Sequence, residues 1–517
     1  MQRHLLSHVI FVAALIVPVI NAPQTATAQS LAPIIYTVRF PSPETHITEI
    51  EAAVPTEKRA SIEMLMAVWS PGFYRVEDYS SRVREMTART KQGVALGVEK
   101  INKSRWRINT GGVSEILISY KLFCNEKSVT TNWVASDLAV LNGPATFITL
   151  AEKRRRPHEV KLELPSTWKQ SMTGLDAAPD RLPHHYRVLD FDTLADSPIM
   201  AGNMNVHEFD IDGSRHYLVD AGEKGEWDGL RAAADLEKMT KETRRFWGFL
   251  PFKKYVFLNV FRQGGGGLEH LNSTLVTANP SRVNTPAGYR AWVALLSHEY
   301  FHAFNVKRLR PIELGPFNYE NPPRTKSLWM AEGFTSYYGD LMIARAGVIS
   351  TQDFLALLSS RIEQLQNSPG RLVQTLEQSS YDVWSNSFSG INPNNTSVSY
   401  YVKGQIVGFL LDAKIKSATG GRKSLDDVMR LAYKRYSGER GFTSDQFRIT
   451  AEEIADLDLK SWFAKTIAST EELDYSEALN WLGLQFVPET WKLEVRKDAT
   501  QSQKSRLRAW LGSPDSQ

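Results

Sequence analysis

The stretch of sequence that decides the fold is Leu295–Pro311, LLSHEYFHAFNVKRLRP. It places His298 and His302 four residues apart, so on an α-helix both imidazoles project from one face and can reach a single cation. Glu299 lies about 100° further round this helix, close enough to act on a water molecule at the metal without being a ligand. The large apolar neighbours indicate a buried helix. Because burying an unpaired polar group costs about 2–7 kcal/mol, we expect a compensating metal ion, and zinc suits the motif.

A third protein ligand must complete such a site, because catalytic zinc keeps three protein ligands and leaves its fourth position for water. A third histidine from the same helix is excluded, since Asn305 and Arg308 occupy the glycine and histidine positions of the extended motif. The remaining candidates are carboxylates further along the chain, namely Glu313, Glu320, Glu332 and Asp340.

Glu332 is the carboxylate that we expect to be the third ligand. It lies in SLWMAEGFTSYYGD, an expected helix, and a second rigid helix is a better platform for a ligand than a loop. Glu320 is closer to the spacing of the shorter HExxH peptidases, but Pro322 and Pro323 follow it and forbid a helix interior. For Asp340 we expect a place on the helix surface rather than a hydrogen bond to a ligand histidine.

Three basic residues, Lys307, Arg308 and Arg310, follow the motif. They could meet a substrate carboxylate, but we interpret them as the solvated end of a helical run, Gly288–Leu309, where cations suit the helix dipole. The net charge of the whole chain is only +4 and its lysines and arginines are scattered. Nucleic-acid binding therefore has no support.

The N-terminal residues have the pattern of a cleavable export signal. Arg3 precedes an apolar run, Val9–Ile20, and Ala26–Ala28 is a small-residue cleavage site, so we expect residues 1–28 to be a signal peptide. The run is too short to cross about 30 Å of hydrocarbon, and no membrane span is expected after cleavage. Cys124 is the only cysteine, and we interpret it as a small buried hydrophobe. Without an internal disulfide, the bacterial periplasm is the expected location, with secretion as the alternative.

The polarity pattern divides the rest of the chain. Residues 29–210 contain short alternating runs such as ITEIEAAV and SEILISYKLF, which predict an N-terminal domain of the β-sandwich type. From about Glu223 the period is helical, except for a strand, a glycine loop and a second strand within Lys253–Val276. The predicted fold is therefore multidomain α+β, with a catalytic domain at residues 211–345, a helical region at 346–487 and a polar tail at 488–517. A length of 517 residues allows several separate cores.

Four motifs, GGGGLEH, HEYFHAFNVKRLRP, LWMAEGFTSYYGDL and SYYVKG, occur in this order. With them the chain resembles the glycyl aminopeptidase family of HExxH zinc metallopeptidases, over roughly Ile34–Leu484. The resemblance implies a thermolysin-like catalytic domain after the β domain and one Zn²⁺ per chain. It also implies a C-terminal PDZ module, of which only a first strand, RLRAWLG in the polar tail, is expected here.

The resemblance also implies a role for the glycine-rich segment Gly264–His270, whose matching glutamate in zinc aminopeptidases holds the α-amine of the substrate. We therefore expect Glu269 to bind a free N-terminus. Gly265, Gly266 and Gly267 let a backbone approach closely, as an extended substrate paired along this edge requires. Composition alone would favour a flexible glycine turn with a surface acid.

In SYYVKG, Tyr401 matches the tyrosine of the related YxKG pattern, and its phenol could donate to the oxyanion formed during amide hydrolysis. Tyr400 is the alternative, because adjacent tyrosines cannot be separated without geometry. The predicted activity is hydrolysis of peptide bonds by a water that zinc activates and Glu299 deprotonates, releasing small N-terminal residues from peptides or proteins with a free N-terminus. A zinc endopeptidase of the same fold and a catalytically silent binding protein are the alternatives.

Overall fold

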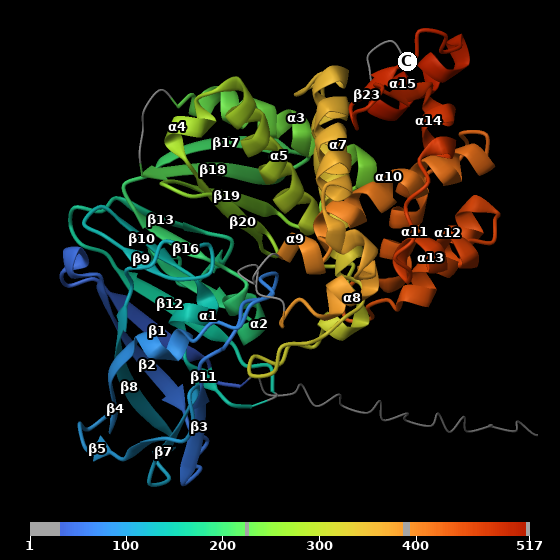
Figure 1. Cartoon of the computed structure of the whole chain (residues 1–517). Coiled ribbons are helices and arrows are strands. Elements are labelled where there is room, and N and C mark those ends of the chain that lie inside the picture. Colours follow the sequence, from blue (N-terminus) through green and yellow to red (C-terminus); the bar gives the residue numbers. More distant parts are fainter. Residues whose placement is uncertain (1–30, 153, 223–226, 386–392, 513–517) are drawn as a thin grey trace, which may run out of the picture.

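The structure is a computed structural model that describes residues 31–152, 154–222, 227–385 and 393–512 of the chain. The expected signal peptide at residues 1–28 lies outside the described residues. Figure 1 shows a β-rich N-terminal domain, then a mixed layer of sheet and helices, and then a helical region. The multidomain α+β fold predicted from the sequence is confirmed.

Alternating burial builds the N-terminal domain. Along β8 (Glu115–Phe123) every second side chain is buried, and β2 (Ile47–Pro55) has nearly the same pattern, as the sequence predicts. These strands lie in an eight-stranded sheet of order β14-β15-β12-β1-β2-β8-β4-β5. Its other strands are β1 (Ile34–Arg39), β4 (Val83–Thr90), β5 (Ala95–Leu96), β12 (His158–Glu163), β14 (Asp176–Ala177) and β15 (His185–Val188).

Two four-stranded sheets complete this domain. The first has the order β11-β3-β7-β6 and shares one hydrophobic core with the eight-stranded sheet. The second, β13-β16-β10-β9, lies between two cores: some of its residues join the core of the eight-stranded sheet, and others pack against the sheet of the next domain. Cys124 is fully buried in the shared core, as predicted. The strands are β3 (Ser61–Leu65), β6 (Val98–Lys100), β7 (Arg105–Asn109), β9 (Trp133–Val134), β10 (Leu138–Leu141), β11 (Thr149–Leu150), β13 (Gln170–Thr173) and β16 (Ile199–Gly202).

A mixed five-stranded sheet of order β17-β18-β19-β21-β20 opens the second domain. One face packs on β13-β16-β10-β9, and the other is covered by helices α3 (Gly229–Trp247) and α5 (Pro286–His302). The strands are β17 (Asn205–Ile211), β18 (Ser214–Gly222), β19 (Lys254–Phe261), β20 (Gly266–Glu269) and β21 (Ser273–Ala278). The boundary expected at residue 210 thus falls inside β17, because that strand pairs with β18 along its whole length.

The helix with the HExxH motif is shorter than predicted. Instead of continuing to Leu309, α5 ends at His302, and the chain then turns. The imidazole of His302 explains part of this ending, because its Nδ1 lies 2.8 Å from the carbonyl oxygen of Asn305. A continued α-helix would direct that carbonyl along the helix axis and away from the ring.

The C-terminal half is helical, as predicted. A π-helical turn, η4 (Trp329–Phe334), leads directly into α6 (Thr335–Arg345) and packs on α10 (Tyr400–Ala418). Ser350, Ser424 and Thr443 begin three helices of this half, each with a capping box. The other elements of this half are α7 (Thr351–Gln366), α8 (Leu376–Tyr381), α9 (Pro393–Thr396), α11 (Leu425–Tyr436), α12 (Ser444–Ala455), α13 (Lys460–Ile467), α14 (Ser476–Leu482), β22 (Leu484–Phe486) and β23 (Leu493–Val495).

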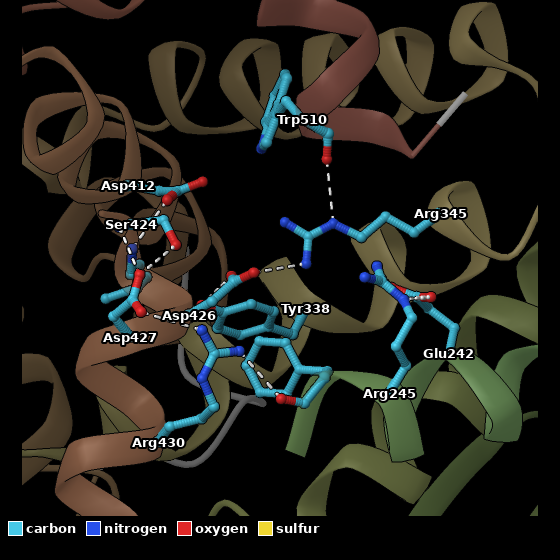
Figure 2. Close-up of polar contacts among 12 residues, drawn as sticks. Glu242, Arg245, Tyr338, Arg345, Asp412, Ser424, Asp426, Asp427, Arg430 and Trp510 are labelled. Atoms are coloured by element: carbon cyan, nitrogen blue, oxygen red, sulfur yellow. Dashed lines mark hydrogen bonds and ion pairs between the residues drawn. The ribbon is translucent and has the colours of Figure 1, made fainter. Parts of the chain in front are cut away.

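The polar tail is not the start of a PDZ strand. Residues Gln501–Leu511 form helix α15, which Thr500 opens with a capping box, and its Trp510 is buried in the catalytic core. Figure 2 shows Arg345 of α6 donating to the carbonyl oxygen of Trp510 at 3.1 Å. The strand expectation was wrong because helix-forming residues dominate QSQKSRLRAWL and its apolar positions pack on this domain.

Short helical turns connect the larger elements: η1 (Pro43–Thr45), η2 (Tyr79–Arg82), α1 (Gly143–Thr146), α2 (Phe191–Ala195), α4 (Pro280–Val283), η3 (Ile312–Leu314) and η5 (Pro369–Leu372). Throughout the residues that the structure describes, the helices are too short or too polar to cross a bilayer.

Candidate active site

The three predicted metal ligands converge. The Nε2 atoms of His298 and His302 are 3.0 Å apart, and the Oε2 atom of Glu332 lies 3.6 Å from the first and 3.1 Å from the second. Ligand atoms bound tetrahedrally to zinc at about 2.0–2.2 Å are about 3.4 Å apart, so this set fits the ion closely. The donor chemistry also fits, because two imidazoles and one carboxylate are common ligands of catalytic zinc.

Both histidines are held by their other ring nitrogen. Nδ1 of His302 lies 2.8 Å from the carbonyl oxygen of Asn305, which can only accept, so Nδ1 carries a proton and Nε2 is the nitrogen left to face a metal ion. Nδ1 of His298 lies 3.3 Å from the hydroxyl of Ser336 on α6. The rings therefore point their Nε2 atoms at the same place.

Glu332 projects from the π-helical turn η4, where the backbone does not form a regular α-helical ladder. The amide of Asn305 donates to the carbonyl oxygens of Met330 and Ala331 at 3.0 and 3.3 Å, and Thr335 donates to Ala331 at 2.7 Å. Asn305 therefore connects the turn after α5 to the turn that carries the third ligand. It occupies the glycine position of the extended motif, which the sequence analysis had used only to exclude a third histidine.

Glu299 is buried beside the metal ligands, and its Oε2 atom has no hydrogen-bond partner. A Cβ atom on Gly267 of β20 would lie 2.2 Å from its Oε1 atom, so only glycine leaves room for this carboxylate. Burial and the nearby acids raise the pKa of Glu299 well above the usual range of a glutamate, although His302 lowers it in part. A carboxylate with one unpaired oxygen and a raised pKa suits the role of a general base.

Glu269 lies at the end of edge strand β20 and is also buried, with an unpartnered Oε1 atom. Burial raises its pKa, even though the charges of His302 and Lys307 act in the opposite direction. Gly72, a residue of the N-terminal domain with φ of 91°, packs against this carboxylate, and a Cβ there would lie 2.3 Å from Oε1. The structure thus brings the predicted glycine-rich edge and its acid to the metal ligands. Gly265 and Gly266 lie further out on the same edge.

Lys307 does not lie at a solvated helix end, and that interpretation was wrong. Its side chain is only 6% exposed, and its Nζ atom pairs with Asp196 at 2.7 Å and lies 4.0 Å from Oε1 of Glu269. Asp196, which follows α2 in the N-terminal domain, also lies 3.1 Å from Nδ1 of His270. Arg308 is held as well, because it donates to the carbonyl oxygen of Ala303 at 2.6 Å. The motif turns inward after His302 and directs these cations toward the domain interface.

The charges of the cluster favour a cation where the ligand atoms meet. Burial lowers the pKa of a histidine, but Glu332, Glu269 and Glu299 outweigh it and raise the pKa of His302 to about 9. The pKa of His298 falls to about 4 through burial and the charge of His302. The two histidines hold the pKa of Glu332 far below its usual range despite its burial. The carboxylates therefore stabilise positive charge on His302, at the centre of the cluster.

Three tyrosines surround the cluster. Tyr74, which the sequence analysis missed, donates from the N-terminal domain to Oε1 of Glu332 at 3.1 Å. No sequence motif signals this residue, because it lies 258 positions from its partner. The ring of Tyr401 lies beside His298, with centroids 6.2 Å apart, while Tyr400 packs on Tyr74 and on Tyr401. Of the two tyrosines in SYYVKG, Tyr401 is the one next to a metal ligand.

The remaining candidate acids have other partners. Glu320 forms a two-pronged ion pair with Arg105, and Glu313 accepts from Thr325. Asp340 is buried and accepts from Gln405 at 2.8 Å, so its expected position on the helix surface was wrong. Nearly all residues of α6 are buried, so Asp340 has a neighbouring helix, α10, beside it instead of solvent.

Helix α5 carries HExxH and covers one face of the sheet, and the π-helical turn η4 adds a glutamate to the two histidines. This arrangement defines a metallopeptidase fold. The profile of the M61 peptidase N-terminal domain matches residues 35–203, and that of the M61 glycyl aminopeptidases matches residues 291–407. The chain belongs to this peptidase family, and is accordingly a hydrolase.

Solved structures support the same fold. An aminopeptidase N family protein from Idiomarina loihiensis is 25% identical, with 87% of this chain and 78% of that chain covered and a TM-score of 0.83. A mutant M1 zinc metallopeptidase from Deinococcus radiodurans, bound to a Tyr-Ser-Ala substrate, is 12% identical over 86% and 95% of the two chains, with a TM-score of 0.52. Yeast LTA4 hydrolase in complex with bestatin is 15% identical over 86% and 68%, with a TM-score of 0.50. No curated protein sequence matches the chain.

Proposed function

We propose that the protein is a zinc-dependent aminopeptidase that releases small N-terminal residues from peptides or proteins. One observation carries this proposal: a metal-ligand set and two buried carboxylates, each with an unpartnered oxygen, occupy a single site. Buried polar atoms normally have partners, and an unpartnered one calls for a functional explanation. Here the explanation is that substrate and water supply the missing partners.

His298, His302 and Glu332 would hold the zinc ion. When bound, zinc supplies a Lewis acid that polarises the scissile carbonyl and makes water more acidic. Glu299 then accepts the proton of the attacking water on its free Oε2 atom and returns that proton to the leaving amine. Tyr401, or Tyr400 in its place, donates from its phenol to the developing oxyanion.

Glu269 and β20 position the substrate in this proposal. The free carboxylate oxygen of Glu269 binds the α-ammonium group, so that cleavage is counted from the N-terminus. Gly265, Gly266 and Gly267 belong to or adjoin an edge strand that leaves backbone groups for pairing with an extended peptide.

A pair of peptides tests the proposal, one with a free N-terminus and the same peptide acetylated. We expect cleavage of the free peptide at its first bond, loss of turnover after chelation, and recovery with Zn²⁺. Equal cleavage of both peptides would instead identify an endopeptidase of the same fold. No cleavage of either by the zinc-loaded protein would identify a silent binding protein.

We also infer that the protein is exported to the periplasm or beyond, from the signal-like residues 1–28. N-terminal sequencing of the protein recovered from a periplasmic fraction checks this inference. The expected first residue is Gln29, and a protein that starts at Met1 would contradict it.

A further inference from the structure

A cavity of about 570 Å³ is lined by residues of both domains, and Glu269 and Tyr74 are among them. Its wall is partly aromatic and aliphatic, with Trp69, Leu314 and Phe317 among the lining residues. Its volume is within the range of ordinary ligand pockets, far more than the side chain of glycine or alanine needs. Space beside the amine-binding carboxylate therefore does not restrict the enzyme to small N-terminal residues.

Most charged groups on the cavity wall have partners within the protein. Lys307 pairs with Asp196, and the exposed residues Arg155 and Glu439 pair with each other. The guanidinium of Arg308 donates to backbone carbonyl oxygens.

The two remaining aspartates of the wall are occupied as well. Asp190 accepts from the backbone and hydroxyl of Thr193, and Asp192 accepts from the hydroxyl of Tyr319 at 2.8 Å.

Two charged groups of opposite sign remain without a close hydrogen-bond partner. One is the carboxylate of Glu269, whose Oε1 atom accepts no hydrogen bond and has only the distant Nζ atom of Lys307, 4.0 Å away, as an ion-pair contact. The other is the guanidinium of Arg310, which makes no side-chain hydrogen bond or ion pair with the residues that the structure describes and whose Nε atom is buried. Burial lowers the pKa of Arg310, the charges of Asp192 and Glu439 oppose this shift, and neither acid forms an ion pair with Arg310.

The local packing holds the guanidinium of Arg310 in place. It lies over the ring of Phe317 at 5.8 Å, and a Cβ on Gly315 would come within 2.2 Å of its Nη2 atom. Glycine at position 315 thus lets the backbone approach the flat guanidinium. A planar guanidinium held in this way suits a carboxylate better than a neutral group, because it can donate two parallel hydrogen bonds.

We propose that this cavity is a subsite for an acidic N-terminal side chain, with the α-ammonium group on Glu269 and the side-chain carboxylate on Arg310. The inference rests on the proposed aminopeptidase function and extends its substrates from small residues to aspartate and glutamate. An uncharged side chain of the same size would leave the guanidinium of Arg310 without an acceptor. We therefore expect discrimination between an acid and its amide, which have nearly the same shape.

The test compares aminoacyl p-nitroanilides of alanine, aspartate, asparagine, glutamate and glutamine with the zinc-loaded full-length enzyme. We expect kcat/KM to be at least about tenfold higher for one acid than for its amide, as a charge-assisted hydrogen bond provides. R310Q should bring that ratio to about 1, whatever it does to the alanyl rate. R39Q, which removes a guanidinium paired with Glu163 on the outer β surface, serves as the matched control and should keep the ratio.

A charge reversal, R310E, adds a second readout and should favour lysyl over glutamyl p-nitroanilide. Alanyl turnover with an acid-to-amide ratio near 1, or a ratio that survives R310Q, would overturn the subsite and leave the proposed function intact. Failure of all five substrates would overturn both.

Discussion

Two buried charge clusters of the catalytic half differ in how completely their groups are paired. In the cluster of Figure 2, Asp426 accepts from Tyr338 at 3.1 Å and from Arg345 at 2.8 Å, and Arg345 also donates to Trp510. Burial would raise the pKa of Asp426, but Arg345 lowers it below its usual range. The pair of Arg345 and Asp426 joins α6 to α11, and the bond to Trp510 joins α6 to α15.

The cluster around the HExxH motif is more deeply buried, with Glu299 4% and Glu269 3% exposed against 15% for the side chain of Asp426, and it leaves one oxygen each of Glu299 and Glu269 without a hydrogen-bond partner. The pKa values of both carboxylates are raised, opposite in direction to that of Asp426. Burial raises the pKa of all three carboxylates, but only at Asp426 does a paired guanidinium reverse the shift, so pairing distinguishes the structural cluster from the candidate site.

The largest expected effect is on turnover. E299Q should lower kcat by about 10²–10⁴-fold, because it removes the general base while leaving the metal ligands intact. Steady-state kinetics and elemental analysis for zinc measure both quantities. E242Q, in the paired cluster of Figure 2, is the matched control and should retain kcat. Full activity of E299Q would show that Glu299 has no part in the chemistry.

For the free energy of unfolding, the substitution in the paired cluster of Figure 2 should be the damaging one. D426N should lower the free energy of unfolding by about 3–5 kcal/mol, because it leaves Arg345 as a buried charge without its counter-ion. E299Q should raise the free energy of unfolding of the metal-free protein, because it removes an unpaired buried carboxylate. Chemical denaturation after chelation compares them. Similar losses in both variants would refute the distinction between the clusters.

The selectivity of the site should depend on Glu269. E269Q should lower kcat/KM for free-amine peptides by about 100-fold, since losing one member of a buried charge pair costs about 2–5 kcal/mol. The acetylated form of the same peptide should be affected much less. Parallel losses for the two peptides would mean that Glu269 does not recognise the amine.

Tyr74 should affect the metal site from the other domain. Y74F removes the donor to Oε1 of Glu332 and should weaken zinc affinity by about 10–100-fold, the usual effect of losing such a supporting hydrogen bond. Competition with a fluorescent chelator measures this affinity. Y79F, which alters a buried tyrosine hydrogen-bonded to Ser70, should bind zinc normally. Unchanged affinity in Y74F would exclude this role.

The smallest effect concerns pH. A lowered pKa means that the stability contributed by Asp426 is present above its unfolded pKa of about 3.9 and is lost as pH falls through the lower folded value. The raised pKa values of Glu299 and Glu269 act oppositely, so the metal-free protein gains stability from them as pH falls toward about 4.3. Melting temperatures from pH 3 to 8 measure both dependences. The loss of stability at low pH should be missing in D426N, and the gain of stability at low pH should be reduced in E299Q.

Local patterns were sufficient for much of this protein. The four-residue spacing of His298 and His302, the alternation in β8 and the capping boxes each depend on a few neighbouring residues, so they can be identified in the sequence. The sequence failed where the chain turns back on itself. Helix α5 stops at His302, and the tail forms α15, because contacts with distant segments override local periodicity.

The sequence by itself identified the candidate ligands, the candidate base and the glycine-rich segment, since these lie in short motifs. Only the tertiary structure decided that Tyr74, Gly72 and Asp196 of the N-terminal domain reach Glu332, Glu269 and Lys307 of the catalytic domain. The physical reason is that such contacts arise when two separately formed cores dock, and no periodicity along the chain records which side chains then meet.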